Sequence, residues 1–105
     1  MPLVQSLVDN NGLQDVVISG THIELTPALT SFVRQQTDRL FRHGLRVSRV
    51  SVEVECDDHR ACGPWFVARG HARTSEREVF ACASADECRE SVTVLLDHLD
   101  RIVAR

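Results

Sequence analysis

The chain of 105 residues has no lysine, no tyrosine and no apolar run long enough to span a membrane. Its first residues, Met1 to Gln5, lack the charged segment and apolar stretch that a signal peptide requires. With 43% hydrophobic and 26% charged residues, the composition is typical of one globular domain. The sequence therefore predicts a cytoplasmic protein with no membrane partner.

Several enzyme signatures are also missing. The five glycines are isolated, so no glycine-rich loop can cradle a phosphate. The five histidines are scattered, and none lies in a motif that sets it beside a nucleophile. Aromatic residues make up 5% of the chain and lack the spacing of an RNA-stacking sheet. We therefore predict no enzymatic activity, no cofactor and no small-molecule substrate.

Charge is unevenly distributed along the chain. The formal net charge is −3, which argues against coating nucleic acid by bulk charge. Residues 34–49, however, carry five arginines against Asp38, a net charge of +4. Arginine binds phosphate in a bidentate manner better than lysine does. This segment is either a solvated helix face or a local phosphate-binding patch on an acidic protein.

Periodicity predicts a single α+β domain with the element order β-α-β-β-β-α. The predicted strands are 15–20, 48–56, 65–73 and 78–83, and helices follow Thr26-Pro27 and Ser84-Ala85-Asp86-Glu87. A four-stranded sheet with both helices packed on one face buries the apolar side of each element. Residues 1–13 end in a turn-rich stretch and are predicted to be a loosely ordered N-terminal extension of domain 14–105.

The helix starts are predicted from capping residues. Thr26 is the expected N-cap of the first helix, with Pro27 at the first helical position. Ser84 and Glu87 fit a capping box for the second helix. The first helix is expected to end at His43-Gly44, where glycine supplies a left-handed cap.

The four cysteines raise the question of a metal site. Cys56 and Cys62 are separated by five residues, as are Cys82 and Cys88, whereas structural zinc sites usually space cysteines more closely. We therefore expect buried thiols and no bound metal. A metal-binding domain that uses these cysteines with His59 stays open as a third alternative.

The stretch from Val17 to Leu29, VISGTHIELTPAL, resembles the opening of the ribosome hibernation-promoting factors, also called ribosome-associated translation inhibitors. In that family an I-T-G-x-x-(V/I)-E-(V/I)-T-x-A-L stretch links the first strand to the first helix. Further matches are Arg39-Leu40, Arg46-Val47, the alternating valines 50–54 and the segment 97–101. The resemblance covers about residues 15–105.

This resemblance implies a fold similar to double-stranded RNA-binding domains and a specific partner. The partner would be the small ribosomal subunit with its 16S-type rRNA, where the protein would block the mRNA and tRNA sites during slow growth or stress. On this basis we expect the rRNA-binding residues to be Arg39, Arg42, Arg46, Arg49, Arg101 and Arg105. The chain resembles a short form without the second domain of long forms.

The sequence also departs from the family in ways that keep an alternative open. Gln36 and His98 stand where lysine is common, and the basic C-terminal tail is absent. A divergent protein-interaction module, which uses the open sheet face or residues 1–13 and no longer binds ribosomes, is therefore the second reading. Weak self-association also remains open.

Overall fold

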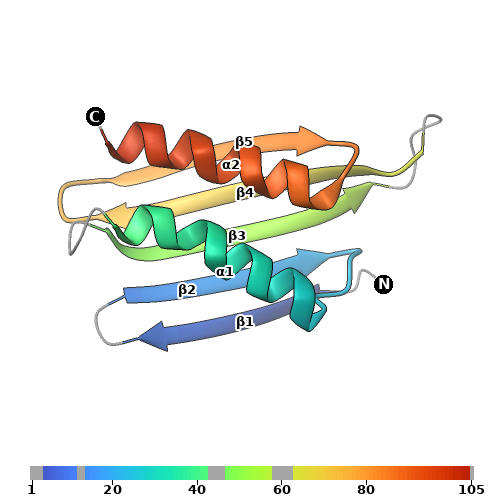
Figure 1. Ribbon diagram of the computed structural model, residues 1–105, viewed down its shortest axis with the longest axis horizontal. Coiled ribbons are helices and arrows are strands. Elements are labelled where there is room, and N and C mark those ends of the chain that lie inside the picture. The colour runs from blue at the N-terminus through green and yellow to red at the C-terminus, as the bar shows by residue number, and fades with distance from the viewer. Residues whose placement is uncertain (1–3, 12–13, 43–46, 58–62, 105) are drawn as a thin grey trace.

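The computed structural model describes residues 4–11, 14–42, 47–57 and 63–104 (Figure 1). The chain forms five strands and two helices: β1 (Val4–Asn11), β2 (Gln14–Thr21), α1 (Pro27–Phe41), β3 (Val47–Asp57), β4 (Trp65–Thr74), β5 (Glu78–Ala85) and α2 (Cys88–Val103). The expected helix end at His43-Gly44 lies outside the described residues.

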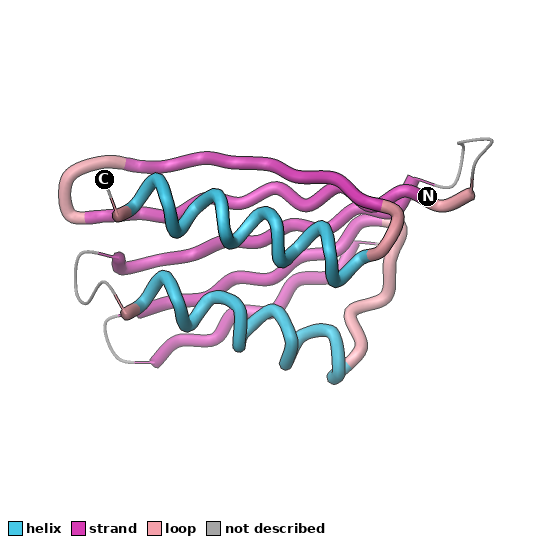
Figure 2. Tube along the Cα trace, turned by 45° about the horizontal axis from the view of Figure 1, so that its top comes forward, coloured by secondary structure: helices cyan, strands magenta, loops and turns pink. Residues whose placement is uncertain are grey.

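The five strands form one sheet in the order β1-β2-β3-β4-β5. β2 and β3 pair in parallel and are joined through α1, whereas the other neighbours pair antiparallel. A parallel pair needs a crossover connection, which α1 supplies. Both helices lie on the same face of the sheet, α1 against β2 and β3 and α2 against β4 and β5 (Figure 2).

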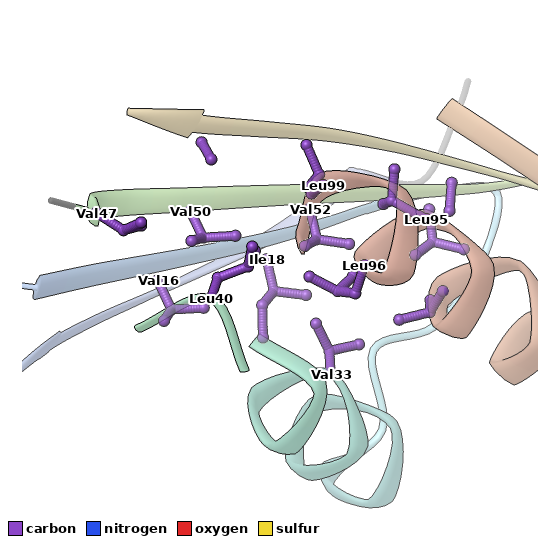
Figure 3. Packing of buried hydrophobic residues seen from close by; sticks show 14 of the residues in the cluster. Val16, Ile18, Val33, Leu40, Val47, Val50, Val52, Leu95, Leu96 and Leu99 are labelled. Atoms are coloured by element: carbon purple, nitrogen blue, oxygen red, sulfur yellow. The ribbon is translucent and has the colours of Figure 1, made fainter. Parts of the chain in front are cut away.

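The core lies between this helix layer and the sheet. Val50, Val52 and Val54 alternate along β3 and are almost completely buried. Leu95, Leu96 and Leu99 of α2, with Val33 and Leu40 of α1, meet them from the helix side (Figure 3). The alternation of one buried and one solvent-facing residue leaves the opposite sheet face open, as the sequence predicts.

The α+β class, the four predicted strands, the two helices and their packing on one face are confirmed. The predicted N-cap of α1 is also correct, because the Thr26 hydroxyl accepts a hydrogen bond from the Leu29 amide at 3.2 Å. Pro27 occupies the start of the helix as expected.

The stretch that resembles the family's opening motif forms a chain reversal between β2 and α1. His22 adopts a positive φ of 58°, and the chain then folds back over Gly20. A Cβ atom at Gly20 would lie 3.0 Å from side-chain carbons of Ile23 and Leu25. The glycine therefore allows this segment to pack closely without displacing these side chains, which gives the motif a structural role.

Residues 4–11, which we expected to be loosely ordered, instead form strand β1 at the sheet edge beside β2. The sequence of this segment alternates poorly, and Asp9-Asn10-Asn11-Gly12 resembles a turn, so local pattern alone predicts no strand. The register pairs Asn11 with Gln14, which leaves two residues between the strands. A two-residue connection that begins with glycine is typical of a β-hairpin, and this short-range signal is consistent with the β1–β2 pair.

The predicted capping box at Ser84 is wrong. β5 continues to Ala85, and Ser84 pairs with Val67 in the ladder to β4. The N-cap of α2 is Glu87, which makes no side-chain capping hydrogen bond. Ser84 cannot cap the helix because its backbone is held in the strand.

Gly70 allows α2 to lie directly against the sheet. A Cβ atom at this position of β4 would lie 2.7 Å from Cδ1 of Leu99 and 3.0 Å from both methyl carbons of Leu95. Real Cβ atoms do not approach so closely, and Leu95 and Leu99 are fully buried. Gly70 therefore sets the distance between α2 and the sheet.

We predict that Gly70→Ala lowers the free energy of unfolding by about 1–3 kcal/mol, because overpacking displaces buried leucines. Urea denaturation followed by circular dichroism measures this loss. The control is a double-mutant cycle with Leu99→Ala, because this second substitution removes the side-chain atom that lies nearest to the new Cβ. In the double variant, the loss of unfolding free energy should be smaller than the sum of the two single losses by at least about 0.5 kcal/mol. Simple additivity would contradict a contact between positions 70 and 99.

The division into an extension and domain 14–105 remains a prediction. The hydrophobic core described above uses residues between Val16 and Val103. We expect a chain that starts at Gln14 to keep a cooperative unfolding transition and the helical circular dichroism signal, with reduced stability because β2 loses its edge neighbour. Loss of cooperative unfolding in the shortened chain would show that β1 is an integral part of the domain.

Candidate nucleic-acid interface

Six described arginines lie toward one end of the molecule, the left end in Figure 1. We call this region the arginine end: Arg39, Arg42, Arg49, Arg73, Arg77 and Arg101. Both helices finish at this end, β3 begins there, and the β4–β5 hairpin turns there. The fold therefore collects arginines that are up to 62 positions apart in the sequence.

Arg39 and Arg101, which the sequence analysis selected, meet at a shared carboxylate between α1 and α2. Nη2 of Arg101 lies 3.0 Å from one oxygen of Asp97, and Nη1 of Arg39 lies 3.9 Å from the other. Arg39 also contacts Gln36 at 3.4 Å. The structure thus joins the two predicted segments at one point, with guanidinium groups from both helices around one anion.

The remaining selected arginines have different positions. Arg42 is exposed at the C-cap of α1. Arg49 precedes the buried Val50 and so points to the open sheet face, opposite the helices. Arg46 and Arg105 lie outside the described residues. The predicted set is therefore divided between two faces at the same end of the molecule.

Sequence reasoning missed Arg73 and Arg77 of the β4–β5 hairpin. Nη2 of Arg77 donates to the carbonyl oxygen of Ile102 at 3.0 Å, in the last turn of α2. Arg73 contacts Glu78 at 3.2 Å. Arg77 and Ile102 are 25 positions apart, and no local pattern reports such a contact.

Carboxylates lie among these arginines. Six acidic residues are placed toward the same end by their elements: Asp15, Asp38, Glu76, Glu78, Asp97 and Asp100. Within the described part of the chain, this end is therefore close to neutral. Arginines near the helix C-termini also stabilise those ends through the helix dipole, so Arg39 and Arg101 have a structural role as well.

The opposite end is clearly acidic. We call it the acidic end: Glu24, Glu55, Asp57, Asp86, Glu87 and Glu90. Arg89 lies there too, but its guanidinium carbon sits 4.9 Å from the ring centre of Phe32, where it links α2 to α1. The charge of the described residues therefore changes along the long axis of the molecule, from balanced to negative.

The open sheet face carries ion pairs that hold its arginines in place. Nη1 of Arg69 lies 2.9 Å from Glu53 and 3.2 Å from Glu55. Slight burial acts to lower the pKa of Arg69, but the hydrogen bonds and charges of Glu55 and Glu53 outweigh it and raise the pKa. Arg69 is thus firmly charged and neutralised by two carboxylates, which makes it a poor phosphate ligand.

A shallow hollow of about 270 Å³ lies on the same face, between β2, β3, β4 and β5. The ring centres of His71 and Phe80 are 4.6 Å apart at its wall, and Nε2 of His71 lies 3.3 Å from Glu78. Phe80 is 69% exposed. The Nε2 atom of His71 therefore faces a carboxylate, and the imidazole ring lies against the ring of Phe80.

The cysteines are only partly as predicted. Cys56 and Cys88 are half-buried, and burial raises the pKa of the Cys88 thiol, with Arg89 acting in the opposite direction. Cys82 is exposed, contrary to the expected buried thiol, because the inward positions of β5 are Val79, Ala81, Ala83 and Ala85. Within the described ranges, no group of three or more His, Cys, Asp or Glu side chains could hold a metal. Cys62 and His59 lie outside those ranges.

Comparisons with known proteins agree with this fold. A family model described as sigma 54 modulation protein / S30EA ribosomal protein matches residues 16–105. A curated ribosome hibernation promoting factor from Acinetobacter guillouiae is 30% identical over 91 residues, which cover 82% of this chain and 80% of that protein. No helix in the described part of this chain is long and apolar enough to cross a membrane.

Two solved structures share the fold at low sequence identity. A ribosomal subunit interface protein from Coxiella burnetii superposes with a TM-score of 0.68 at 15% identity, over 81% of this chain and 88% of that one. The N-terminal domain of Protein Y from Thermus thermophilus gives a TM-score of 0.66 at 17% identity, over 84% and 90% of the two chains.

The cysteine environments predict a clear order of reactivity. In a Cys62→Ser variant at pH 8, we expect Ellman's reagent to modify Cys82 at least about tenfold faster than Cys88. The raised pKa of Cys88 lowers its reactive thiolate fraction, and its burial restricts access of the reagent. The additional change Cys82→Ser should remove the fast phase. A fast phase that survives this change would contradict the exposed position of Cys82 on β5.

Proposed function

Because the chain belongs to the family of sigma 54 modulation proteins and S30EA ribosomal proteins, which includes ribosome hibernation-promoting factors, we propose that it binds the small ribosomal subunit through its arginine end. Membership of this family supports the ribosome as the binding partner. The placement of the arginines supports this choice of surface, and the contacts would be made to phosphates of 16S-type rRNA.

The convergence of Arg39 and Arg101 on Asp97 supports this choice of surface. Two guanidinium groups from neighbouring helices already surround one anionic group, and a phosphate has matching acceptor geometry. The ion pairs of Asp97 lie at the surface, where Arg101 is exposed and Arg39 and Asp97 are partly exposed, and surface pairs contribute about 1 kcal/mol or less. An arginine can therefore exchange Asp97 for an rRNA phosphate at small cost.

The charge gradient supports an orientation of the bound protein. The acidic end repels phosphates, whereas the arginine end is balanced and exposes Arg42, with Arg49 and Arg77 nearby on other surfaces. Because like charges are repelled over about 8 Å at physiological ionic strength, the protein would approach rRNA with the arginine end first.

The proposed mechanism is occupation of the mRNA and tRNA sites, with no chemical step. A hibernation factor of this kind would lower translation during slow growth or stress and would act in the cytoplasm, where ribosomes are found. The half-buried Cys88 and the His71–Glu78 pair have structural explanations that need no catalysis.

Co-sedimentation with small ribosomal subunits tests the proposal. We expect binding at low salt that weakens as salt rises, since each phosphate contact releases counterions. The double change Arg39→Gln and Arg42→Gln should reduce affinity at least about tenfold and lower the slope of log K against log salt by up to about 2.

The matched control is Arg69→Gln, which removes one arginine from the acid-paired cluster on the open face. It should leave sedimentation within about twofold of the unchanged chain. Absence of binding even at low salt would contradict the proposal and favour the protein-interaction module. Equal losses in the control and in the Arg39 and Arg42 variant would contradict the choice of surface.

A further inference from the structure

β5 forms a free edge of the sheet. It pairs with β4 on one side, and no other described strand lies beyond it in the sheet order. Its ladder to β4 runs from Glu78 to Ala85 without a register shift. An edge strand of this length exposes a row of unpaired backbone donors and acceptors that can pair with another strand.

The sequence of β5 lacks the features that usually block such pairing. Residues 79–85 are uncharged and contain no proline, whereas natural edges are commonly protected by charge, proline or a bulge. Phe80 is the exposed large hydrophobic side chain of the described chain, and Cys82 is exposed beside it on the same face. This edge therefore has the properties of an interface.

We propose that two copies of this chain associate through β5, as an antiparallel two-fold pair that continues the sheet. The register that fits places Ala81 opposite Ala81 of the second copy, Phe80 opposite Cys82, and Glu78 opposite Ser84. This register covers both exposed apolar side chains in two Phe80–Cys82 cross-strand pairs. It sets no like charges opposite one another between residues 78 and 84.

The charge gradient of the molecule favours the antiparallel direction. β5 runs from the arginine end to the acidic end, so antiparallel pairing brings the arginine end of each copy beside the acidic end of the other. Arg77 then lies opposite Ala85 and next to Asp86 of the second copy. A parallel pair would bring the two acidic ends together, which is unfavourable.

The helix layer leaves room for a second strand. A hollow of about 400 Å³, lined by Ala81, Cys82, His98, Arg101 and Ile102, lies between β5 and α2 at this edge. α2 therefore does not close over the strand at the position of the proposed axis. The two Arg101 side chains near this axis each keep an Asp97 partner at 3.0 Å, which reduces their mutual repulsion.

Opposite charges introduced at Ser84 test both the association and its register. Sedimentation velocity of the full chain, from about 10 µM to about 1 mM, should show a monomer–dimer equilibrium. Glu78 uses Oε1 for Arg73 and His71 and can accept a further arginine. Ser84→Arg should tighten the dimer about tenfold by pairing with Glu78 of the second copy, and Ser84→Glu should weaken it about tenfold.

The matched controls are Ser31→Arg and Ser31→Glu, which change an exposed serine on α1, away from β5, and should leave the dimer within about twofold. A chain that stays monomeric over the whole range would overturn the proposal. Equal responses to the two Ser84 variants would overturn the register.

Disulfide trapping provides an independent test. In a chain whose four cysteines are replaced by serine, Ala81→Cys should form a covalent dimer with oxidised glutathione, because facing residues in an antiparallel pair have Cα atoms about 4.5–5.5 Å apart. Ala83→Cys, which faces Val79, should not. Circular dichroism confirms that each variant is folded, and equal trapping at both positions would overturn the two-fold axis at Ala81.

Discussion

The parallel pairing of β2 with β3 is the constraint on which the arrangement of the arginine end depends. It requires α1 to cross back over the sheet, so α1 begins where β2 ends and finishes where β3 begins. β5 runs in the same direction as β2, and α2 follows it back in the same way. Both helices therefore finish at the same end of the molecule, and their terminal arginines meet at Asp97 although 62 positions separate Arg39 from Arg101.

The proposed binding of an acidic protein to anionic rRNA depends on where its charges lie. In the described part of the chain the arginine end is close to neutral because it holds as many carboxylates as arginines, and Arg39, Arg73 and Arg101 are paired with carboxylates. The negative charge is concentrated at the acidic end. Pairs on the surface contribute little stability, so the arginines can be transferred from carboxylate to phosphate without loss of the fold. On the proposed function, the affinity would then depend on a few replaceable contacts.

Sequence patterns were sufficient for most of the fold because the core elements have strong periodicity. The alternating valines of β3, the Thr26-Pro27 start of α1 and the apolar stripe of α2 each determine local structure directly. β1 was missed because an edge strand is defined by its neighbour and carries little pattern of its own. The capping box predicted at Ser84 does not form, because the backbone pairing of β5 with β4 overrides the capping sequence.

The candidate surface was less predictable, since it is made of contacts between distant segments. The distribution of charge along the sequence selects Arg39, Arg42 and Arg101, but it does not predict on which face of the molecule each side chain lies. It therefore groups Arg49 with them, although the side chain of Arg49 points to the open face of the sheet. Sequence patterns do not predict a role for Arg77, because its contact with Ile102 exists only after the hairpin packs against α2.

The measurement that tests the central claim most directly is an electron cryo-microscopy structure of this chain bound to small ribosomal subunits. Density that places Arg39, Arg42 and Arg101 against rRNA phosphates, with the acidic end directed away, is the predicted result. Binding through the open sheet face or the acidic end would contradict it.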